Sequence, residues 1–500
     1  MSIADGLSEQ ANLQGIHREL LSAVARKVLR DRLRTLLSAG TTLGPCRLRK
    51  VRFTVDAELS VFYLVQLRHK ACEGYCVRPI VVRWRSKTDP DCHEEVAELA
   101  PMQAEAVRRG LAAPFLQLMA DFPEQSMQIR VAPLDARFTQ LVRLSDPQHV
   151  RTMVAAAYAS NRATSHKPGS SEYAVTPVHY HPGRRHVLRY DPVDRAKGRT
   201  LFAKLYVGDD GARAFQLAQC VADWLAEHGE GVNCLRPLAY VAADKVVLYP
   251  AVVGTPLSNH RQRPCRLGQW LRRTGGALRI LHDLPLALAG PLTLHDFAAE
   301  IQETSWKSDH VRALLPQVGA AIDALLNRAR ELHARLPQEP PSFIHGDLKL
   351  KHIWTVSGGL TLIDFDSSRL ADPALDLGKL MADWQFWHLD GDQTGAGEAH
   401  ESLLAGYAPG APKERLIRAR LYQAVELIKW TVLRVQPSEH DWASRTARLV
   451  DRAHAVINDL QLTLGLPVRQ LSVHRSVNSF QSPPHGYSIR AHPSARAGGR

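Results

Sequence analysis

Two short stretches, FIHGDLKLKHIW at residues 343–354 and LIDFD at residues 362–366, carry the clearest signal in this chain. Each begins with an apolar run that predicts a short strand. Asp347 stands in a tight loop after the first run, and Asp364 follows the second. The sequence therefore predicts two carboxylates in loops after two successive strands.

Phosphoryl transfer from ATP needs this layout. One aspartate receives or orients the proton of the acceptor, and the other holds the magnesium ion that bridges the ATP phosphates. In the kinase template a further metal-binding residue, an asparagine, follows the first aspartate by five positions. That position is His352 in this chain.

The pattern resembles the catalytic core of the aminoglycoside phosphotransferase and choline kinase families, which are relatives of the protein kinases. The resemblance covers roughly residues 173–465 and is strongest over residues 343–380. It implies an α+β, two-lobed protein-kinase-like fold with a small β-rich lobe and a large helical lobe. An extra N-terminal α/β module precedes these lobes.

The resemblance implies roles for three residues of the two stretches. Asp347 is expected to act as the catalytic base and Asp364 to bind the metal. For Asp347, a structural role in capping a turn is the weaker interpretation. Lys349 matches the lysine that protein kinases place beside the γ-phosphate, although a solvated loop lysine fits equally well.

His352 departs from the family pattern. An imidazole is a less natural Mg²⁺ ligand than an amide or carboxylate oxygen, because this hard ion prefers oxygen. His352 is therefore expected to bind metal weakly, to contact a phosphate as a donor, or only to pack and form hydrogen bonds. The last two interpretations together are favoured over the first.

In the small lobe, Lys204 within FAKL (residues 202–205) looks like the strand lysine that grips the α- and β-phosphates of ATP. A lysine among alternating apolar residues is costly unless its charge is paired, which favours a functional role over an edge-strand position facing solvent. The glutamate that usually pairs with this lysine from a helix is not evident, since Gln216, Gln219 and Asp223 occupy the available turns.

The segment HPGRR (residues 181–185) stands where kinases have a glycine-rich loop. It lacks the G-x-G-x-x-G pattern, so phosphate contacts are expected from the Gly183 amide and from Arg184 or Arg185. Residues 249–254 would form the hinge that meets adenine.

Four regions are expected along the chain. Residues 1–158 form an N-terminal module of unknown role, residues 173–254 the small lobe, residues 255–467 the helical large lobe, and residues 468–500 a disordered basic tail. Small and polar residues at 159–172 mark the boundary between the first two regions.

Hydrophobic periodicity predicts the main elements of these regions. Helices are expected over residues 1–45, 94–119, 212–227, 275–284, 311–336 and 413–433. Strands are expected over residues 51–55, 61–67, 79–84, 127–131, 175–180, 186–190, 200–207, 238–242, 245–250 and 360–363.

A faint internal echo links the first two regions. Residues 53–63 followed by 80–84 run parallel to residues 180–190 followed by 201–205, and each set ends in a strand with a cation. The N-terminal module is thus a candidate for a diverged second sheet of the small-lobe type. Chance similarity between strand-rich segments is the simpler explanation.

Composition bounds the function classes. The 500 residues carry a formal net charge of +13, but arginine is spread along the whole chain and no basic block is interleaved with aromatics, so nucleic acid is an unlikely partner. Polycationic acceptors would need an acidic site, and anionic or neutral acceptors suit this charge better.

The seven cysteines are scattered, which suits reduced thiols. A zinc site at Cys72, Cys76, Cys92 and His93 is much less favoured than incidental cysteines. No apolar run is long enough to span a membrane, and the N-terminus does not read as a secretory signal, so a cytoplasmic location is expected.

These observations together predict an ATP- and Mg²⁺-dependent phosphotransferase that acts on a small-molecule hydroxyl or amine. The alternative is a catalytically weak or inactive kinase-like protein that binds ATP. A protein kinase is disfavoured because only seven residues separate Asp364 from Asp372, which leaves no room for a long activation loop. The sequence carries no signature of the acceptor or of an oligomeric state.

Overall fold

The computed structural model describes residues 23–53, 59–69, 75–84, 91–160, 171–196, 198–260, 264–389, 394–436, 439 and 441–468. The tail expected at 468–500 lies outside these residues apart from Val468, as do the first 22 residues of the N-terminal helix and Cys72 of the candidate zinc set.

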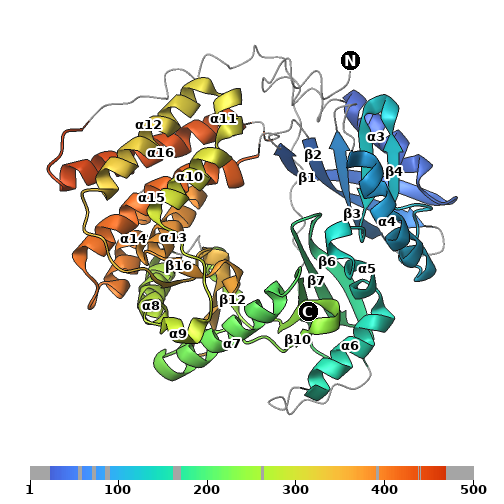
Figure 1. Ribbon diagram of the computed structural model, residues 1–500, viewed down its shortest axis with the longest axis horizontal. Coiled ribbons are helices and arrows are strands. Elements are labelled where there is room, and N and C mark those ends of the chain that lie inside the picture. Colours follow the sequence, from blue (N-terminus) through green and yellow to red (C-terminus); the bar gives the residue numbers. More distant parts are fainter. Residues whose placement is uncertain are drawn as a thin grey trace.

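Three parts of the chain are visible in Figure 1. A sheet with two helices, drawn in blue, forms the N-terminal module, and a second sheet, drawn in teal and green, lies beside it. The helical large lobe, drawn in yellow to red, lies on the other side of both. The arrangement matches the expected order of an N-terminal module, a small lobe and a large lobe.

The N-terminal module is a five-stranded antiparallel sheet of order β1-β2-β3-β5-β4, with helices packed on one face. Its strands alternate in burial, so that Val61, Val65 and Ile80 form one core with the helices. Its elements are α3 (Ala23–Thr35), β1 (Thr41–Phe53), β2 (Leu59–His69), β3 (Cys76–Trp84), α4 (Asp91–Arg108), β4 (Met119–Phe122) and β5 (Met127–Val131).

The small lobe is also a five-stranded antiparallel sheet, of order β6-β7-β8-β11-β10. One helix, α7, follows its third strand. Its elements are β6 (Tyr173–His181), β7 (Arg185–Pro192), β8 (Leu201–Leu205), α7 (Asp210–His228), β10 (Ala239–Val241) and β11 (Val246–Pro250).

The two sheets share one topology. In each, three sequential strands form a meander, a helix follows, and two further strands return so that the fifth lies beside the third. The last turn also agrees, because Ser126 and Lys245 adopt nearly equal positive φ values of 48° and 47°. This shared topology supports the internal echo over chance similarity.

Two helices join the modules, α5 (Leu141–Leu144) and α6 (Pro147–Ser160). Their apolar residues, such as Val150 and Tyr158, share one core with Tyr190 and Leu201 of the small-lobe sheet. The core of the small lobe therefore extends across the boundary expected at residues 159–172.

The large lobe surrounds its catalytic loops with helices. These are α8 (Pro264–His282), α9 (Leu286–Ala289), α10 (Phe297–Lys307), α11 (Asp309–Leu314), α12 (Pro316–His333), α13 (Ala374–Trp387), α14 (Thr394–Tyr407), α15 (Lys413–Leu433) and α16 (Trp442–Thr463). Helix α13 is buried along nearly its whole length, which makes it the central helix of the lobe.

Short strands position the loops that carry the two aspartates. β13 (Ser342–Ile344) pairs with β16 (Arg369–Ala371), and a second sheet has the order β12-β14-β15-β9. Its strands are β9 (Val232–Cys234), β12 (Thr255–Pro256), β14 (Ile353–Val356) and β15 (Gly359–Leu362). Because β9 follows α7 directly, this sheet also connects the large lobe to the helix of the small lobe.

Most expected elements are confirmed, and α15 and β5 have the expected bounds. Four helix predictions were wrong at one end or in the middle. The helix expected over residues 275–284 is the second half of α8, which begins at Pro264. The first helix stops at Thr35, because the β-branched pair Thr41 and Thr42 begins β1. Helix α4 ends at Arg108, before a loop that contains Pro114. The helix expected over residues 311–336 is divided at Pro316, which starts α12.

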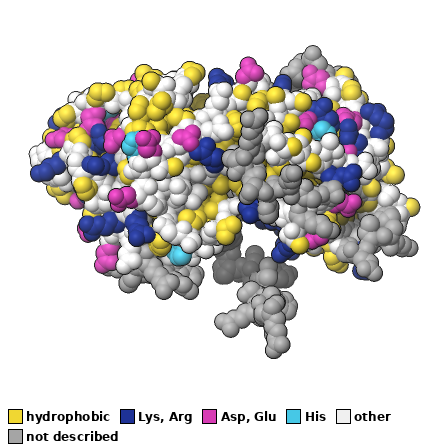
Figure 2. Space-filling model, turned by 90° about the horizontal axis from the view of Figure 1, so that it is seen from below, with side chains coloured by type: hydrophobic (Ala, Val, Ile, Leu, Met, Phe, Trp, Pro, Cys, Tyr) yellow, Lys and Arg dark blue, Asp and Glu magenta, His cyan; other side chains and the backbone are white. Residues whose placement is uncertain are grey.

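Lys and Arg side chains lie scattered among acidic and apolar ones on the face that Figure 2 shows. None of the helices in the described ranges is long and apolar enough to cross a bilayer.

We predict that Gly275→Ala destabilises the large lobe. A Cβ at Gly275 would lie 2.2 Å from the Leu403 carbonyl oxygen of α14, so α8 and α14 would have to separate. The expected loss is about 1–3 kcal/mol of unfolding free energy in urea. Gly276→Ala is the matched control, because its Cβ meets only the Gly406 oxygen, at 3.8 Å. Equal effects of the two substitutions would contradict this packing.

Candidate active site

The loop that carries Asp347 is held by helix α13. The first Asp376 oxygen accepts a hydrogen bond from the Gly346 amide at 2.9 Å, and the second accepts one from the His345 amide at 2.7 Å. Gly346 has φ = 75°, and a Cβ there would lie 2.1 Å from the Ser367 carbonyl oxygen. Only glycine fits this position, because both the backbone conformation and the space exclude a side chain.

The other end of the same loop is held by a second carboxylate of α13. Asp383 accepts a hydrogen bond from the Leu350 amide at 2.7 Å and forms an ion pair with Arg434. Asp376 and Asp383 are seven residues apart, which places them on one face of the helix, two turns from each other. One buried helix face therefore fixes both ends of the Asp347 loop.

His345 connects this loop to the strand that precedes Asp364. Its Nε2 donates to the Ile363 carbonyl oxygen at 3.0 Å, and its Nδ1 accepts from the Asp347 amide at 3.3 Å. Asp364 itself adopts a left-handed conformation with φ = 72°. A non-glycine residue is strained there, and such strain is typical of positions that a surrounding structure holds for function.

Lys204 of β8 reaches across from the small lobe. Its Nζ lies 2.5 Å from Asp364 Oδ1 and 2.7 Å from Asp366 Oδ2, and only 7% of the residue is exposed. Tyr206 also donates to Asp366, at 2.9 Å. The structure therefore brings Lys204 and Asp364 together, 160 residues apart in sequence.

Among the described residues, no carboxylate of α7 takes the role of the usual helix glutamate. Asp223 forms an ion pair with Arg236 instead, and Glu227 is exposed. The partners of the Lys204 ammonium come from the Asp364 loop. Asp366 is one of these partners.

Both expected catalytic carboxylates are held ionised. Burial alone would raise the pKa of Asp364, but the Lys204 ammonium and the Arg185 guanidinium lower it well below its ordinary value. Burial likewise opposes ionisation of Asp347, and the Lys349 and Lys379 ammonium groups lower the pKa of Asp347 to about 2. Both groups therefore carry a negative charge at neutral pH.

Lys349 pairs with Asp347, with its Nζ 2.7 Å from Asp347 Oδ1. The same ammonium lies 5.3 Å above the ring of Trp430, which supports it from α15. Lys351, in the same loop, is exposed.

His352 is buried between the two aspartates. Its Nδ1 donates to the Asp347 carbonyl oxygen at 2.8 Å, and its Nε2 lies 3.5 Å from Asp364 Oδ2. Burial lowers the pKa of His352 to about 3, against the opposing effect of Asp364. The neutral ring then turns a lone pair, not a proton, toward Asp364. Potential ligand atoms of Asp347, His352 and Asp364 lie within 4.8 Å of one another.

The segment at 181–185 differs from a free phosphate-binding loop. The Gly183 amide, expected to meet phosphate, donates to Asp135 of the N-terminal module at 2.7 Å, and Arg137 donates to the Gly183 carbonyl at 2.9 Å. Arg184 is exposed, whereas Arg185 contacts both oxygens of Asp364, at 3.1 and 3.3 Å. The arginine that reaches the Asp364 carboxylate is therefore Arg185.

Asp135 is the residue that sequence reasoning missed. It is 1% exposed and, besides Gly183, contacts the His186 Nε2 at 2.6 Å. No motif marks Asp135, because its partners lie about 50 residues further along the chain. The signal available was only an Asp that precedes a short helical turn, where it accepts from the Arg137 amide.

The part of the chain that holds these residues is similar to a known protein family. Residues 190–416 match the phosphotransferase enzyme family. The match begins in β7, includes Lys204, Asp347 and Asp364, and ends in α15. This match confirms the resemblance, which is strongest over residues 343–380. The matched residues lie in the two lobes of the kinase-like fold, after the extra N-terminal module.

Solved structures similar to this chain include a choline/ethanolamine kinase family protein from Mesorhizobium loti, 19% identical, which covers 61% of this chain and 95% of its own with a TM-score of 0.41. A choline kinase from Cryptosporidium parvum is 11% identical, covers 67% and 99%, and has a TM-score of 0.44. An aminoglycoside phosphotransferase from Streptomyces rimosus is 21% identical, covers 51% and 93%, and has a TM-score of 0.35. None of the curated proteins compared with the chain matches it.

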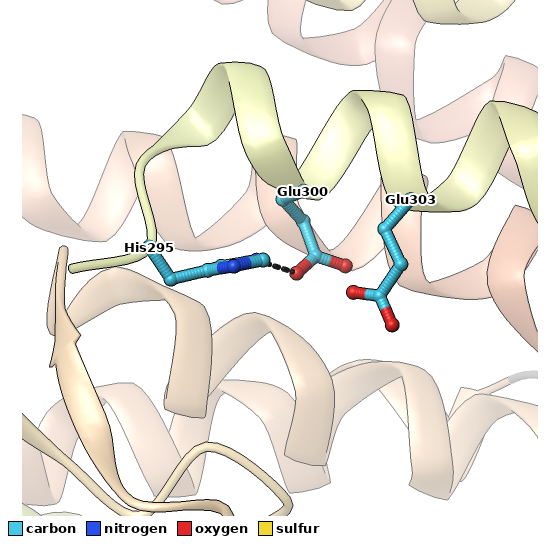
Figure 3. Close-up of side chains that lie close together, drawn as sticks. All are labelled: His295, Glu300 and Glu303. Carbon is cyan, nitrogen blue, oxygen red and sulfur yellow. Dashed lines mark hydrogen bonds and ion pairs between the residues drawn. The ribbon is translucent and has the colours of Figure 1, made fainter. Parts of the chain in front are cut away.

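A second group with metal-ligating atoms lies elsewhere in the phosphotransferase-family region. Figure 3 shows His295 and Glu300 joined by a hydrogen bond, with Glu303 beside them on α10. The Lys429 ammonium fills this group, 2.5 Å from Glu300 and 2.8 Å from Glu303. A bound ammonium already supplies the positive charge, so this group is a buried ion network that joins α10 to α15.

We predict that His352 makes the metal-free protein less stable as pH falls from about 6.5 to about 3. Its folded-state pKa of about 3 lies below the ordinary value of 6.5, so in this window only the unfolded chain takes up the proton. The contribution of the neutral His352 to the unfolding free energy is fully present above pH 6.5 and is lost as the pH falls toward 3. The unfolding free energy then changes by up to about 1.4 kcal/mol per pH unit.

Urea unfolding of the wild type and of His352→Gln at several pH values, with a chelator present, measures this effect. The difference between the two proteins should change across the window and level off above it. A difference that is constant with pH would contradict a neutral, buried His352.

Proposed function

We propose that this protein is an ATP-dependent phosphotransferase that acts on a hydroxyl or amine of a small molecule. The observation that carries the proposal is the meeting of three side chains from distant parts of the chain. Lys204 of the small lobe pairs with Asp364, and Asp364 lies beside Asp347 of the large lobe. This is the charge arrangement that transfer of a γ-phosphoryl group requires.

In the proposed reaction the acceptor oxygen or nitrogen forms a bond to the γ-phosphorus, and the bond from that phosphorus to the bridging oxygen of ADP breaks. The acceptor proton passes to Asp347. With a pKa of about 2, Asp347 is a weak base, so its main role is to orient the acceptor. That suffices because a loose transition state develops little need for proton removal before the bond to phosphorus has formed.

Three cations would balance the phosphate charge in the proposed reaction. Lys204 and Arg185 converge on the Asp364 side, and Lys349 stands on the Asp347 side. Lys204 would orient the α- and β-phosphates, Arg185 rather than Arg184 would contact phosphate, and Lys349 would offset charge on the transferring group.

The donor set near Asp364 fits a divalent cation. Asp364 and Asp347 offer carboxylate oxygens, and the unprotonated Nε2 of His352 faces the same space. Asp364 would be the main ligand, with His352 as a nitrogen ligand beside it. When bound, Mg²⁺ would supply positive charge that offsets the charge of the phosphates.

A nucleotide-binding protein with weak or no turnover is the second candidate. It is favoured by the direct contact between Lys204 and Asp364, which a nucleotide and its metal would have to open, and by the histidine at position 352. Turnover measurements separate the two candidates.

We predict that Asp347→Ala and Asp364→Ala each lower metal-dependent ATP turnover in the presence of acceptor by about 10²–10⁴-fold. Turnover is measured by ADP release over a library of metabolites with hydroxyl and amine groups. Asp209→Ala is the matched control, because Asp209 is exposed and its side chain makes no capping hydrogen bond. Full turnover in either site variant would contradict the proposed roles, and nucleotide binding without turnover in the wild type would favour the second candidate.

We further predict that His352→Asn shifts the metal preference toward Mg²⁺. An imidazole nitrogen is accepted more readily by Mn²⁺ than by Mg²⁺, whereas an amide oxygen suits Mg²⁺. The ratio of turnover with Mn²⁺ to turnover with Mg²⁺ should therefore fall in the variant. An unchanged ratio would assign His352 to phosphate contact or packing instead.

A further inference from the structure

The end of strand β1 lies at the junction of the two lobes. The Val51 amide donates to Gln436 Oε1 at 3.3 Å, shortly after α15 of the large lobe ends. On the other side, the Arg52 guanidinium lies 4.9 Å above the ring of Phe62, and the edge of that ring meets His181 of the small lobe at 5.3 Å. The N-terminal module therefore contacts the large lobe through the end of β1 and the small lobe through Phe62 of β2, which pairs with Lys50.

Basic side chains gather at this strand end. The positive charge of Arg184 in the small lobe acts on both Lys50 and Arg52 of β1. The charge of Lys349, in the Asp347 loop, also acts on Lys50. Burial and these neighbouring charges lower the pKa of Lys50 to about 8 and that of Arg52 to about 10. Lys50 and Arg52 are half-buried, so water screens their repulsion only in part.

The same three side chains, Lys50, Arg52 and Arg184, form no ion pair with any carboxylate in the described ranges. Lys349 and Arg185, in contrast, are paired with Asp347 and Asp364. Bringing unpaired cations together while removing them partly from water costs folding free energy. A bound anion would remove that cost and add charge-assisted hydrogen bonds.

A neutral polar group completes this surface. Burial, with Arg52 and Lys50 close by, lowers the pKa of His181 to about 3, so its ring is uncharged at neutral pH. Its Nδ1 is buried and has no hydrogen-bond partner among the described residues. The uncharged His181 ring adds no further positive charge to the cluster.

We propose that Lys50, Arg52 and Arg184 form an anion subsite for the acceptor, and that the acceptor is a small molecule with a carboxylate, phosphate or sulfate group beside the hydroxyl or amine that is phosphorylated. This inference rests on the proposed function. It gives the N-terminal module a direct role in binding substrate.

The position of the cluster assigns it to the acceptor rather than to the nucleotide. Lys204 and Arg185, the cations of the nucleotide side, contact Asp364. Lys50 instead has Lys349 as its neighbour, and Lys349 contacts Asp347, the residue proposed to orient the acceptor. An acceptor with its hydroxyl at Asp347 would extend past Lys349 toward β1. Polycationic acceptors such as aminoglycosides would meet repulsion there.

Matched acceptors test the proposal first. ADP release is compared for glycerol, glycerate and glycerol 3-phosphate, for glucose, gluconate and glucose 6-phosphate, and for choline and kanamycin. The anionic member should be the better acceptor in any series that reacts. A preference for neutral or cationic acceptors, with ATP turnover intact, would overturn the subsite and leave the proposed function standing.

Variants on one strand test it second. Arg52→Gln and Lys50→Gln should raise the KM of the anionic acceptor roughly tenfold to a hundredfold, the effect of losing one hydrogen bond to a charged group. Their KM for ATP and their kcat should change little. Arg47→Gln is the matched control, since Arg47 lies exposed on the same strand. A rise in the KM of ATP instead would assign the cations to the nucleotide and overturn the proposal.

A binding measurement separates failure of the subsite from failure of the reaction. Inorganic phosphate is titrated calorimetrically into the full chain saturated with ADP and Mg²⁺, so that the nucleotide site is filled. Binding should weaken at least tenfold in Arg52→Gln and not in Arg47→Gln. Equal binding in all three proteins would overturn the subsite. Absence of turnover with every acceptor, despite ADP binding, would contradict the proposed function itself.

Discussion

The contact between Lys204 and Asp364 is the interaction on which the candidate active site depends. It joins the small lobe to the large lobe through a buried ammonium and carboxylate, and it lowers the pKa of Asp364 well below its ordinary value. Each charge would be costly to bury alone, so each needs the other or a ligand that replaces it. Under the proposed function a nucleotide and its metal would replace this contact, because they would carry both signs of charge into the same space.

This ion pair is placed by structure that lies away from it. Helix α13 uses Asp376 and Asp383 to fix the Asp347 loop, and His345 ties that loop to the strand before Asp364. On the small-lobe side, Asp135 of the N-terminal module holds the Gly183 turn that leads into Arg185. The N-terminal module thus helps to hold the turn from which Arg185 reaches Asp364.

Much of the fold could be predicted from local signals. The period of apolar residues located most helices and strands. The resemblance carried by the two aspartate stretches and by the strand lysine predicted that Asp347, Asp364 and Lys204 share one site. Helix ends were predicted less well, because a proline or a β-branched pair stops a helix even where the apolar pattern continues. The choice between Arg184 and Arg185 could not be made, since which of two adjacent side chains faces the site depends on how the turn packs.

The sequence by itself determined the chemistry: which residues carry charge, how far apart the two aspartates stand, and that a histidine replaces the usual metal-binding asparagine. Only the tertiary structure decided which charges meet. Lys204 takes Asp364 and Asp366 as partners instead of a helix carboxylate, Gly183 donates to Asp135, and Lys50 and Arg52 are left beside Lys349. The physical reason is that electrostatic energy depends on distance in space and on exclusion of water, and neither can be read from spacing along the chain.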